Sequence, residues 1–514
     1  MSLKKLFVIV LVLLMAATVL AGCSSAKPKM AKEITIASGA DPISLDPRKT
    51  WVGPGYSMNA HIFEPLVFRE EKDGKISLVP VLAEKIENTD PLTWKFTLRK
   101  NVKFHNGKPF NAAAVKYTIE SIQDPNFNTP LKIWVSDIDK VTTDGDSVVI
   151  IKTKYPAAGL LSSLAQVSIV EPSAAQTMGN DFNTAPVGTG PYKIVKYTPN
   201  SQLVVERFKD YWGKPGTYDR ITFKIMPENA VRLAALQNGE VQLAEAIPPD
   251  KIATVKKDPN LDIASSKTFR VAFLNIDESK KNKWLNNIKF RQAVSLAIDR
   301  KTLVDSILGG TTIVASSVSP PGTVGFNTDL KPYEFNLDKA KSLLKDIGYD
   351  GTPIKLGGPS GRYNMDKQIM EALAGMLKAA GINVDLEVLE WSSFYPKTRT
   401  HAYDIWYIGQ TDFTMNPNKH WEGKYDSKTS DIGYSNAEVD KLMTSAAGEL
   451  DQNKRADMYK RVQEILYTEM PTVPLYYEPQ IIGIRKGLEG FQPRMDEYVI
   501  MTYTTFTGST TSSK

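Results

Sequence analysis

The sequence predicts a mixed α/β protein, and three observations support this prediction. Short segments in which apolar and polar residues alternate, as in half-buried strands, are interspersed with segments whose apolar residues recur three and four positions apart, as in amphipathic helices. The chain has 514 residues and no internal repeat. Cys23 is its only cysteine, so buried cores rather than disulfides must stabilise the fold.

The first residues of the chain predict export. Lys4 and Lys5 form a basic start, and residues 6–19 are an uncharged run that is apolar except for Thr18. This run is too short to span a bilayer comfortably and is followed by small residues. It is therefore typical of a secretory signal rather than of a transmembrane helix.

The sequence Leu-Ala-Gly-Cys that ends at Cys23 resembles the lipobox of bacterial lipoproteins, in which the cysteine is acylated and becomes the new N-terminus. The resemblance implies that residues 1–22 are a lipoprotein signal peptide and that Cys23 is the lipidation site. Residues 23–32 would then be a polar tether at a membrane surface. The alternative is an ordinary signal peptide with a chance cysteine.

Charge is nearly balanced along the chain. Lysine and arginine number 63 against 57 aspartate and glutamate residues, and the two signs are interspersed. The sequence has no basic cluster of the kind that binds a nucleic-acid backbone, so no nucleic-acid partner is predicted. The roughly 490 residues left after removal of the signal are enough for about three domain-sized units.

Strands and helices are predicted from these patterns and from the residues that cap them. The predicted strands are residues 32–38, 201–208, 220–226, 384–388 and 403–409, the last of which breaks at Gly409. One helix is predicted from the N-cap Asn336 to Gly348. A second helix covers residues 366–380 and is followed by Gly381, which tolerates the positive φ found at a helix C-terminus.

The segment TAPVGTGPYKI, residues 184–194, places Gly188 and Gly190 one residue apart. A phosphate-binding loop is a poor interpretation, because a predicted strand follows rather than a helix whose N-terminus would bind an anion. Pro186 and Pro191 also remove amide donors that such a loop needs. We expect a tight turn at a junction between domains instead.

Four segments together resemble the family 5 extracellular solute-binding proteins of ABC importers, the receptors for dipeptides, oligopeptides and nickel. They occur in the family's order, and the resemblance extends from about Ile34 to Phe491. The segments are PLTWKFTLRKNVKFHNGKPFNAAAVKYTIES, APVGTGPYKIVKY, FRQAVSLAIDRKTLVDSILGG and YEFNLDKAKSLLKDIGY.

The resemblance implies a bilobal, periplasmic-binding-protein-like fold of the large three-domain type II form, with a ligand cleft between two hinged lobes. Two hinge-proximal segments would cross between the lobes, Phe269–Asp277 and Val473–Ile484. The expected units are lobe I (33–60, 186–269 and 484–506), a small domain packed on it (61–185) and lobe II (270–483).

Motifs for catalysis, metal binding and phosphate binding are missing from the sequence. Its four histidines include no HExxH pair, and neither a GxxxxGK[ST] loop nor a GxSxG elbow occurs. No catalytic residue, metal ligand or cofactor is therefore predicted, and an exported hydrolase remains only as a remote alternative.

The candidate ligand-binding residues lie in lobe II. Asp412 follows a predicted strand, and in peptide-binding relatives an aspartate in the matching loop holds the ligand's ammonium group. Arg362 precedes the helix at 366–380, and in dipeptide-binding relatives an arginine in the matching loop binds the ligand carboxylate. Each could instead be an ordinary loop residue, and Gln410 stands where relatives often have an aromatic residue.

Aromatic residues would form the walls of the ligand site. We favour Trp391, at the end of a predicted strand, and Trp421, in the loop beyond Asp412, and Tyr407 is a further candidate. Trp406 lies on the strand itself and is interpreted as buried. His420, next to Trp421, lies near the expected site.

The predicted function is that of a lipid-anchored receptor, a monomer on the outer face of the cytoplasmic membrane. It would capture a small peptide or peptide-like solute, close its lobes over it and deliver it to the membrane subunits of an ABC permease. The alternative is the same role for a nickel chelate, an opine, a sugar or another small zwitterion.

Overall fold

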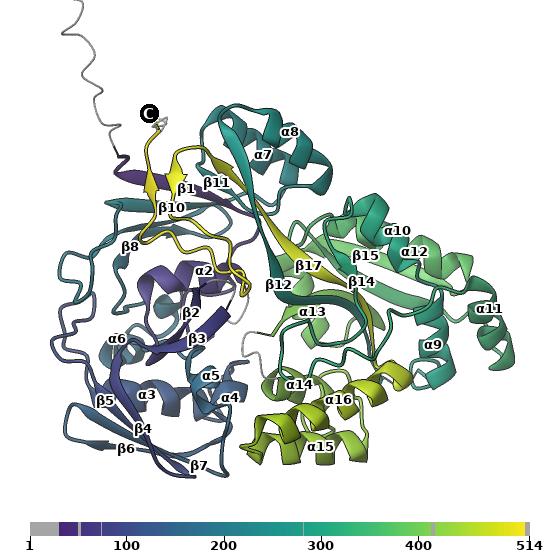
Figure 1. Ribbon diagram of the computed structural model, residues 1–514, viewed down its shortest axis with the longest axis horizontal. Helices are drawn as coiled ribbons and strands as arrows, with labels where there is room; N and C mark the ends of the chain where they lie inside the picture. Colours follow the sequence, from purple (N-terminus) through teal and green to yellow (C-terminus); the bar gives the residue numbers. More distant parts are fainter. Residues whose placement is uncertain (1–29, 50–52, 73–74, 281, 413–416, 509–514) are drawn as a thin grey trace, which may run out of the picture.

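The computed structural model describes residues 30–49, 53–72, 75–280, 282–412 and 417–508. The predicted signal peptide and Cys23 lie outside these residues. Within them the chain alternates between helices and strands, which confirms the predicted mixed α/β class (Figure 1). No helix in these ranges is long and apolar enough to cross a membrane.

One eleven-stranded sheet runs through both lobes (Figure 1). Its order is β15-β14-β16-β12-β17-β11-β1-β10-β9-β8, and β13 also pairs with β17. The strands are β15 (Val384–Glu390), β14 (Ile354–Ser360), β16 (Ile405–Thr411), β12 (Leu261–Ile276), β17 (Thr472–Arg485), β11 (Leu243–Ala244), β1 (Glu33–Ser38), β10 (Arg220–Ile225), β9 (Gln202–Arg207), β8 (Tyr192–Thr198) and β13 (Ile313–Val314). The strands predicted from alternation are all present in this sheet.

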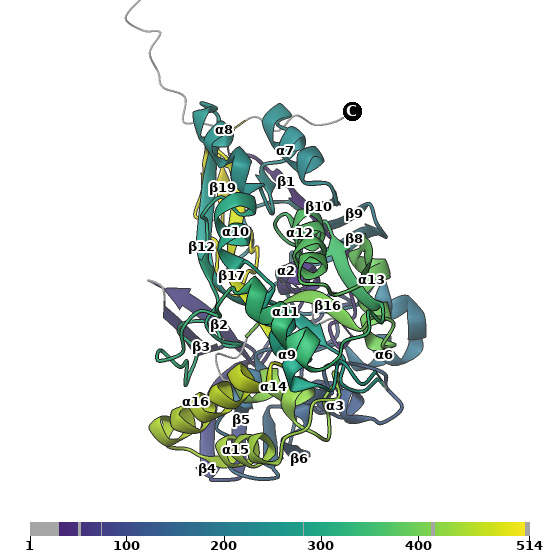
Figure 2. The ribbon, with the colours of Figure 1, turned by 90° about the vertical axis from the view of Figure 1, so that its right-hand side faces the viewer.

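The middle of the sheet consists of β12 and β17, which pair antiparallel and run side by side along the molecule (Figure 2). They contain the two segments predicted to cross between the lobes. Their register is broken after Lys267, which pairs with Pro479, so that residues 268–270 face Glu478 alone. A bulge of this kind bends a strand, and it lies here between the two lobes.

Lobe II surrounds its strands with helices α9 (Ile288–Leu296), α11 (Leu337–Asp346), α12 (Asp366–Ala379), α13 (Trp391–Arg399), α14 (Pro417–Tyr425), α15 (Ala437–Gly448) and α16 (Gln452–Glu469). Both predicted helices are confirmed. The Asn336 side chain caps α11 by accepting a hydrogen bond of 3.0 Å from the Lys339 amide. Gly381, just past α12, has a φ of 93°, which is the reason that glycine suits this position.

The small domain has its own four-stranded antiparallel sheet, in the order β4-β5-β7-β6. Its strands and principal helices are β4 (Ala83–Asp90), β5 (Thr93–Leu98), β6 (Ile138–Asp144), β7 (Val148–Thr153), α3 (Ala112–Gln123) and α4 (Lys132–Val135). A hairpin of β2 (Val67–Lys72) and β3 (Lys75–Pro80) precedes this sheet. In lobe I, α2 (Gly53–Ile62) and α7 (Asn229–Asn238) accompany the sheet.

Buried hydrophobic residues form separate clusters that follow this organisation. One cluster is built almost entirely from residues 272–476 and another from residues 66–169. A third combines residues 34–63, 170–225 and 482–506 with Leu243. The predicted domain limits stay a prediction, because residues 170–182, assigned from sequence to the small domain, pack into the lobe I cluster.

The glycines of the segment 184–194 are required for close packing rather than for a positive φ. A Cβ on Gly190 would lie 2.6 Å from the carbonyl carbon of Ile62, and one on Gly188 would lie 2.2 Å from the Ile62 oxygen. The Gly190 amide also donates to that oxygen at 2.9 Å. These two glycines therefore let the chain pack directly against the C-terminal end of α2, and β8 follows as predicted.

Gly409 does not end its strand, contrary to the sequence prediction, because β16 continues to Thr411. The reason for glycine is again close packing. A Cβ here would lie 2.7 Å from Cδ of Arg270 and 3.0 Å from the ring of Tyr363.

Candidate functional site

A cavity of about 330 Å³ lies between the small domain and lobe II. The small domain contributes residues on and around α4, including Trp134 and Ser136. Lobe II contributes Arg362, Trp391, Trp406 and residues of α14. We call lobe II one half of the molecule and lobe I with the small domain the other half. Since both halves supply walls of the cavity, movement of one half against the other would change the cavity directly.

Three parallel strands of lobe II point their carboxyl ends at this cavity. β14 pairs in parallel with β15 on one side and with β16 on the other. Arg362 follows the end of β14, Trp391 follows β15, and Gln410 and Thr411 end β16, and all four line the cavity. Ligands of open α/β sheets bind outside the carboxyl ends of the strands, so this is the expected place for a ligand.

The backbone around Arg362 is held by the first residue of α12. The Asp366 carboxylate accepts hydrogen bonds from the amides of Gly361, Arg362 and Tyr363 at 3.0, 2.8 and 2.9 Å. Burial raises the pKa of Asp366 to about 6, although these hydrogen bonds favour its charged form. The loop that carries Arg362 is thus fixed before any ligand arrives.

The Arg362 guanidinium packs on aromatic rings. Its Cζ atom lies 4.9 Å from the ring centre of Tyr363 and 5.5 Å from that of Trp391, both within the range of a cation–π contact. Among the described residues, no carboxylate oxygen lies within 4.0 Å of this guanidinium, and its Nε is buried without a hydrogen-bond partner. The indole nitrogen of Trp391 is also buried without a hydrogen-bond partner among the described residues. Both groups are donors, and their hydrogen-bonding capacity is unused among the described residues.

Arg270, the second arginine at this end of the cavity, is already neutralised. Its Nε donates to Glu497 at 2.6 Å and its Nη1 donates to the Gly409 carbonyl at 2.9 Å, while Glu478 lies 3.6 Å away. Burial opposes the charge of Arg270, but Glu497, Tyr363 and Glu478 together outweigh burial and raise its pKa. Arg270 therefore supports the cavity wall through its contacts with Glu497 and Gly409. Of the two arginines, Arg362 is the one that could bind an anionic group of a ligand.

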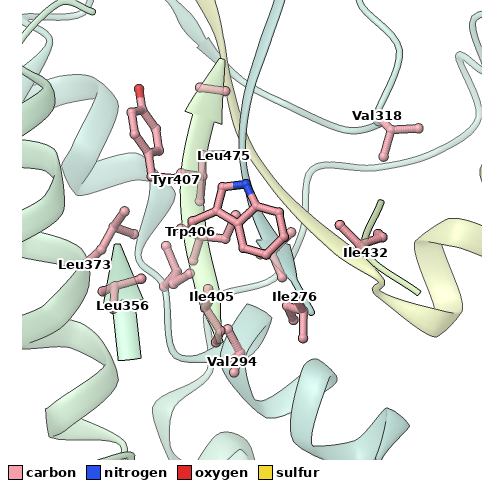
Figure 3. Packing of buried hydrophobic residues seen from close by; sticks show 14 of the residues in the cluster. Ile276, Val294, Val318, Leu356, Leu373, Ile405, Trp406, Tyr407, Ile432 and Leu475 are labelled. Carbon is pink, nitrogen blue, oxygen red and sulfur yellow. The ribbon is translucent and has the colours of Figure 1, made fainter. Parts of the chain in front are cut away.

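The aromatic candidates separate into wall and core residues. Trp391 lines the cavity, and so do Trp406, Trp134 and Tyr395. Tyr407 is not part of the lining: it points to the opposite side of β16 from Trp406 (Figure 3), where its hydroxyl lies 2.7 Å from that of Tyr476. Trp406 is buried, as expected, and it also borders the cavity, which strand alternation could not reveal because both sides of this strand are covered.

Trp421 lies on helix α14 rather than in a loop, and it is not part of the lining. Its ring packs edge-on against Tyr425 and Tyr459 in the lobe II core. Pro417 at the first position of α14 is a helix-start signal that sequence reasoning overlooked. The same helix brings four residues to the cavity that were not proposed as ligand contacts, namely His420, Glu422, Gly423 and Lys424.

Asp412 directly follows the lining residues Gln410 and Thr411 but does not itself line the cavity. Its side chain is buried, and its amide donates to the Phe269 carbonyl at 2.9 Å. Residues 413–416, the next part of this loop, lie outside the described residues. Arg362 and Trp391 are therefore together at the cavity, whereas Asp412, Tyr407 and Trp421 stand behind its surface.

His420 lines the cavity in its neutral form. Burial lowers its pKa to about 3, and the nearby charge of Lys424 contributes in the same direction. Within the described residues, no group of three or more His, Cys, Asp and Glu side chains is arranged to hold a metal ion.

A buried ion pair joins the two halves beside the cavity. Lys419 on α14 donates to Ser136 and Asp137 of the small domain, each at 2.6 Å, and to Glu422 of its own helix at 2.8 Å. The side chains of Lys419 and Asp137 are only 5% and 9% exposed. Lobe II and the small domain are therefore in contact beside the cavity.

Comparison with known proteins agrees with this architecture. The family model for bacterial extracellular solute-binding proteins, family 5 (middle), matches residues 77–431. Among curated relatives, the glutathione-binding protein GsiB of Salmonella choleraesuis (strain SC-B67) is 28% identical over 498 residues, covering 93% of this chain and 95% of the relative.

Solved structures share the fold over nearly the whole chain. DppA from Helicobacter pylori in complex with the peptide STSA superposes with a TM-score of 0.87 at 24% identity, covering 94% of this chain and 99% of that one. NikA from Staphylococcus aureus in complex with Ni(L-His)2 gives 0.82 at 23% identity, covering 93% and 100%. The bilobal type II fold is thus confirmed, and the relatives are receptors rather than enzymes. The chain belongs to the bacterial extracellular solute-binding proteins of family 5, the receptors of ABC importers.

Proposed function

We propose that this receptor captures a small peptide or peptide-like solute by binding the free carboxylate of the solute. The observation that carries the proposal is the Arg362 guanidinium, which faces an aromatic-walled cavity without an ion pair among the described residues. A guanidinium offers two parallel donors to a planar carboxylate, and the adjacent indole of Trp391 adds a third. The fixed loop at Asp366 means that little ordering is needed when the ligand binds.

In the same proposal, the carboxylate of Asp412, just behind the cavity surface, supplies the negative charge that attracts the ligand's ammonium group. Support comes from the resemblance to peptide receptors and from the position of Asp412 immediately after Gln410 and Thr411, which line the cavity. A zwitterionic ligand would then be held at both termini by opposite charges. Such contacts are strong where water is excluded.

Capture is completed by closure of the two halves, after which the closed receptor is recognised by the membrane subunits of an ABC permease. A ligand shifts the equilibrium toward the closed form only if it contacts both halves there. The cavity meets that requirement, because Trp134 of the small domain and Trp391 of lobe II both line it. We further propose that the protein acts as a monomer, anchored through an acylated Cys23 to the outer face of the cytoplasmic membrane.

A nickel chelate is the second candidate cargo. His420 favours it, because a neutral imidazole in the cavity wall is a suitable ligand for nickel. The relative in complex with Ni(L-His)2 adds to the case. The glutathione-binding relatives favour a peptide-like cargo instead.

Isothermal titration of the mature receptor tests the proposal with dipeptides, tripeptides, glutathione and a nickel–histidine chelate. We expect a member of the peptide group to bind, and Arg362→Ala and Asp412→Ala to weaken that binding about ten- to hundredfold each. Arg220→Ala, at an exposed arginine of lobe I, is the matched control. Binding of the chelate alone, lost in His420→Ala and kept in Arg362→Ala, would replace the peptide assignment with the nickel one.

A further inference from the structure

A second cationic site lies in the wall of the same cavity, centred on Lys424 of α14. The Lys424 side chain is 7% exposed, and its Nζ donates to Asn275 Oδ1 at 3.0 Å. Asp431 Oδ1 lies 3.9 Å from Nζ, beyond hydrogen-bond distance. An ammonium group has three donors. Among the described residues only Asn275 accepts a hydrogen bond from it, and the Phe273 ring centre lies 5.2 Å from Nζ, so this buried cation can still donate to a further acceptor beside the cavity.

The protein compensates the charge of Lys424 only in part. Asp431 is the nearest carboxylate, and its other oxygen already accepts from Arg399 at 2.7 Å. Glu422, also in the lining, accepts from Lys419 at 2.8 Å. Burial lowers the pKa of Lys424, Asp431 opposes this effect, and Arg399 adds to it. Two cations thus share one carboxylate, and an incoming anion would compensate the buried charge.

This site is separate from the one at Arg362. Arg362 and Arg270 both lie over the ring of Tyr363, and Arg270 donates to Gly409, which pairs with Ala272 of β12. Lys424 is bound instead to Asn275, which lies three residues beyond Ala272 on β12. At roughly 3.3 Å per residue, the two positions are about 10 Å apart along β12. Arg362 and Lys424 are thus held by different residues of the cavity wall.

We propose that the cargo is an acidic peptide with two carboxylates, one bound by Arg362 and a second, from a side chain, bound by Lys424. The inference rests on the proposed function, which assigns the first carboxylate to Arg362. The two cations contact different residues of the cavity wall, Tyr363 and Asn275, so the two carboxylates would belong to different parts of the peptide.

The experiment compares tripeptides that differ by one charge. Isothermal titration is carried out with trialanine derivatives in which one glutamate occupies each position in turn, and with the matching glutamine peptides. In the wild-type receptor we expect the best glutamate peptide to bind about ten- to hundredfold more tightly than its glutamine partner. In Lys424→Met, which keeps the length and apolar stem of the side chain, that ratio should fall to about one.

Lys345→Met is the matched control, since it removes a lysine from the exposed side of α11, and it should keep the wild-type ratio. Thermal melting of both variants establishes that each is folded. Equal affinity for glutamate and glutamine peptides in the wild type, or an unchanged ratio in Lys424→Met, would overturn the inference and leave the proposed function standing. Absence of binding by every peptide, neutral or acidic, would instead overturn the proposed function.

Discussion

The ion pair between Lys419 and Asp137 should control closure of the receptor. Replacement by Lys419→Met removes the cation, and the closed form then buries the Asp137 carboxylate without its main partner. In the open form the same carboxylate is free to be hydrated. The substitution therefore destabilises the closed form selectively.

The magnitude follows from the geometry. Lys419 makes two hydrogen bonds of 2.6 Å across the interface, and both charged side chains are at least nine-tenths buried. Loss of one partner of a fully buried pair costs about 3–5 kcal/mol. Asp137 keeps the hydroxyl of Tyr155 as a donor, so we take about 2 kcal/mol. In a receptor that is mainly open without cargo, this reduces affinity roughly thirtyfold.

Titration calorimetry with the identified cargo measures the affinity, and small-angle scattering at a cargo concentration that saturates the wild type measures closure. Lys419→Met should remain largely open under that condition, whereas Lys428→Met, at an exposed lysine of the same segment, should close. Adding Asp137→Asn to Lys419→Met should restore part of the affinity, because the buried charge is gone. An affinity of Lys419→Met within threefold of the wild type would refute the reasoning.

Three further predictions concern packing, protonation and the cavity wall. Gly190→Ala should lower the free energy of unfolding by more than about 2 kcal/mol in urea titrations, because its Cβ has no room beside Ile62. Gly375→Ala, whose Cβ meets nothing within 4 Å in the middle of α12, should raise it by up to about 1 kcal/mol; equal effects would contradict the packing argument. Burial raises the pKa of Glu478 to about 7 in the folded protein. The protonated side chain therefore stabilises the fold fully at a pH below its unfolded-state pKa, and this stabilisation is lost as the pH rises toward 7. Glu478→Gln should therefore raise the melting temperature more at pH 8 than at pH 5, and a pH-independent change would disprove this. Trp406→Ala should weaken cargo binding at least about tenfold in calorimetry, and unchanged binding would exclude it from the site.

Local patterns predicted the regular elements of the fold well. The helix α12 and the strand β15 follow from spacing and from Gly381 alone, because a helix face and its cap are encoded within a few residues. Gly188, Gly190 and Gly409 were correctly recognised as special, but for the wrong reason. Each is in contact with a residue distant in sequence, and no local pattern records such a neighbour.

The candidate site was predicted less completely. Arg362 was proposed from its place before a helix and from the resemblance to dipeptide receptors, and Trp391 from its place at the end of a strand. The structure adds that both follow parallel strands, a position where ligands bind in open α/β sheets. Trp406 and Trp421 are both buried aromatic residues, and only the tertiary structure shows that Trp406 borders the cavity and Trp421 does not. Lys419 and Lys424 gave no sequence signal, because a lysine in a helix is usually solvated.

The place of β17 in the sheet has a consequence for the order of events in the life of the chain. This strand lies between β12 and β11, yet it is formed by residues 472–485, near the end of the sequence. Until the ribosome has made those residues, the two lobes have no central strand to join them, and their sheet edges remain unpaired. Slow, non-local pairing of this kind keeps a nascent chain from reaching its final compact state. For a protein that acts outside the cytoplasm, delayed completion keeps the polypeptide threadable until it has crossed the membrane.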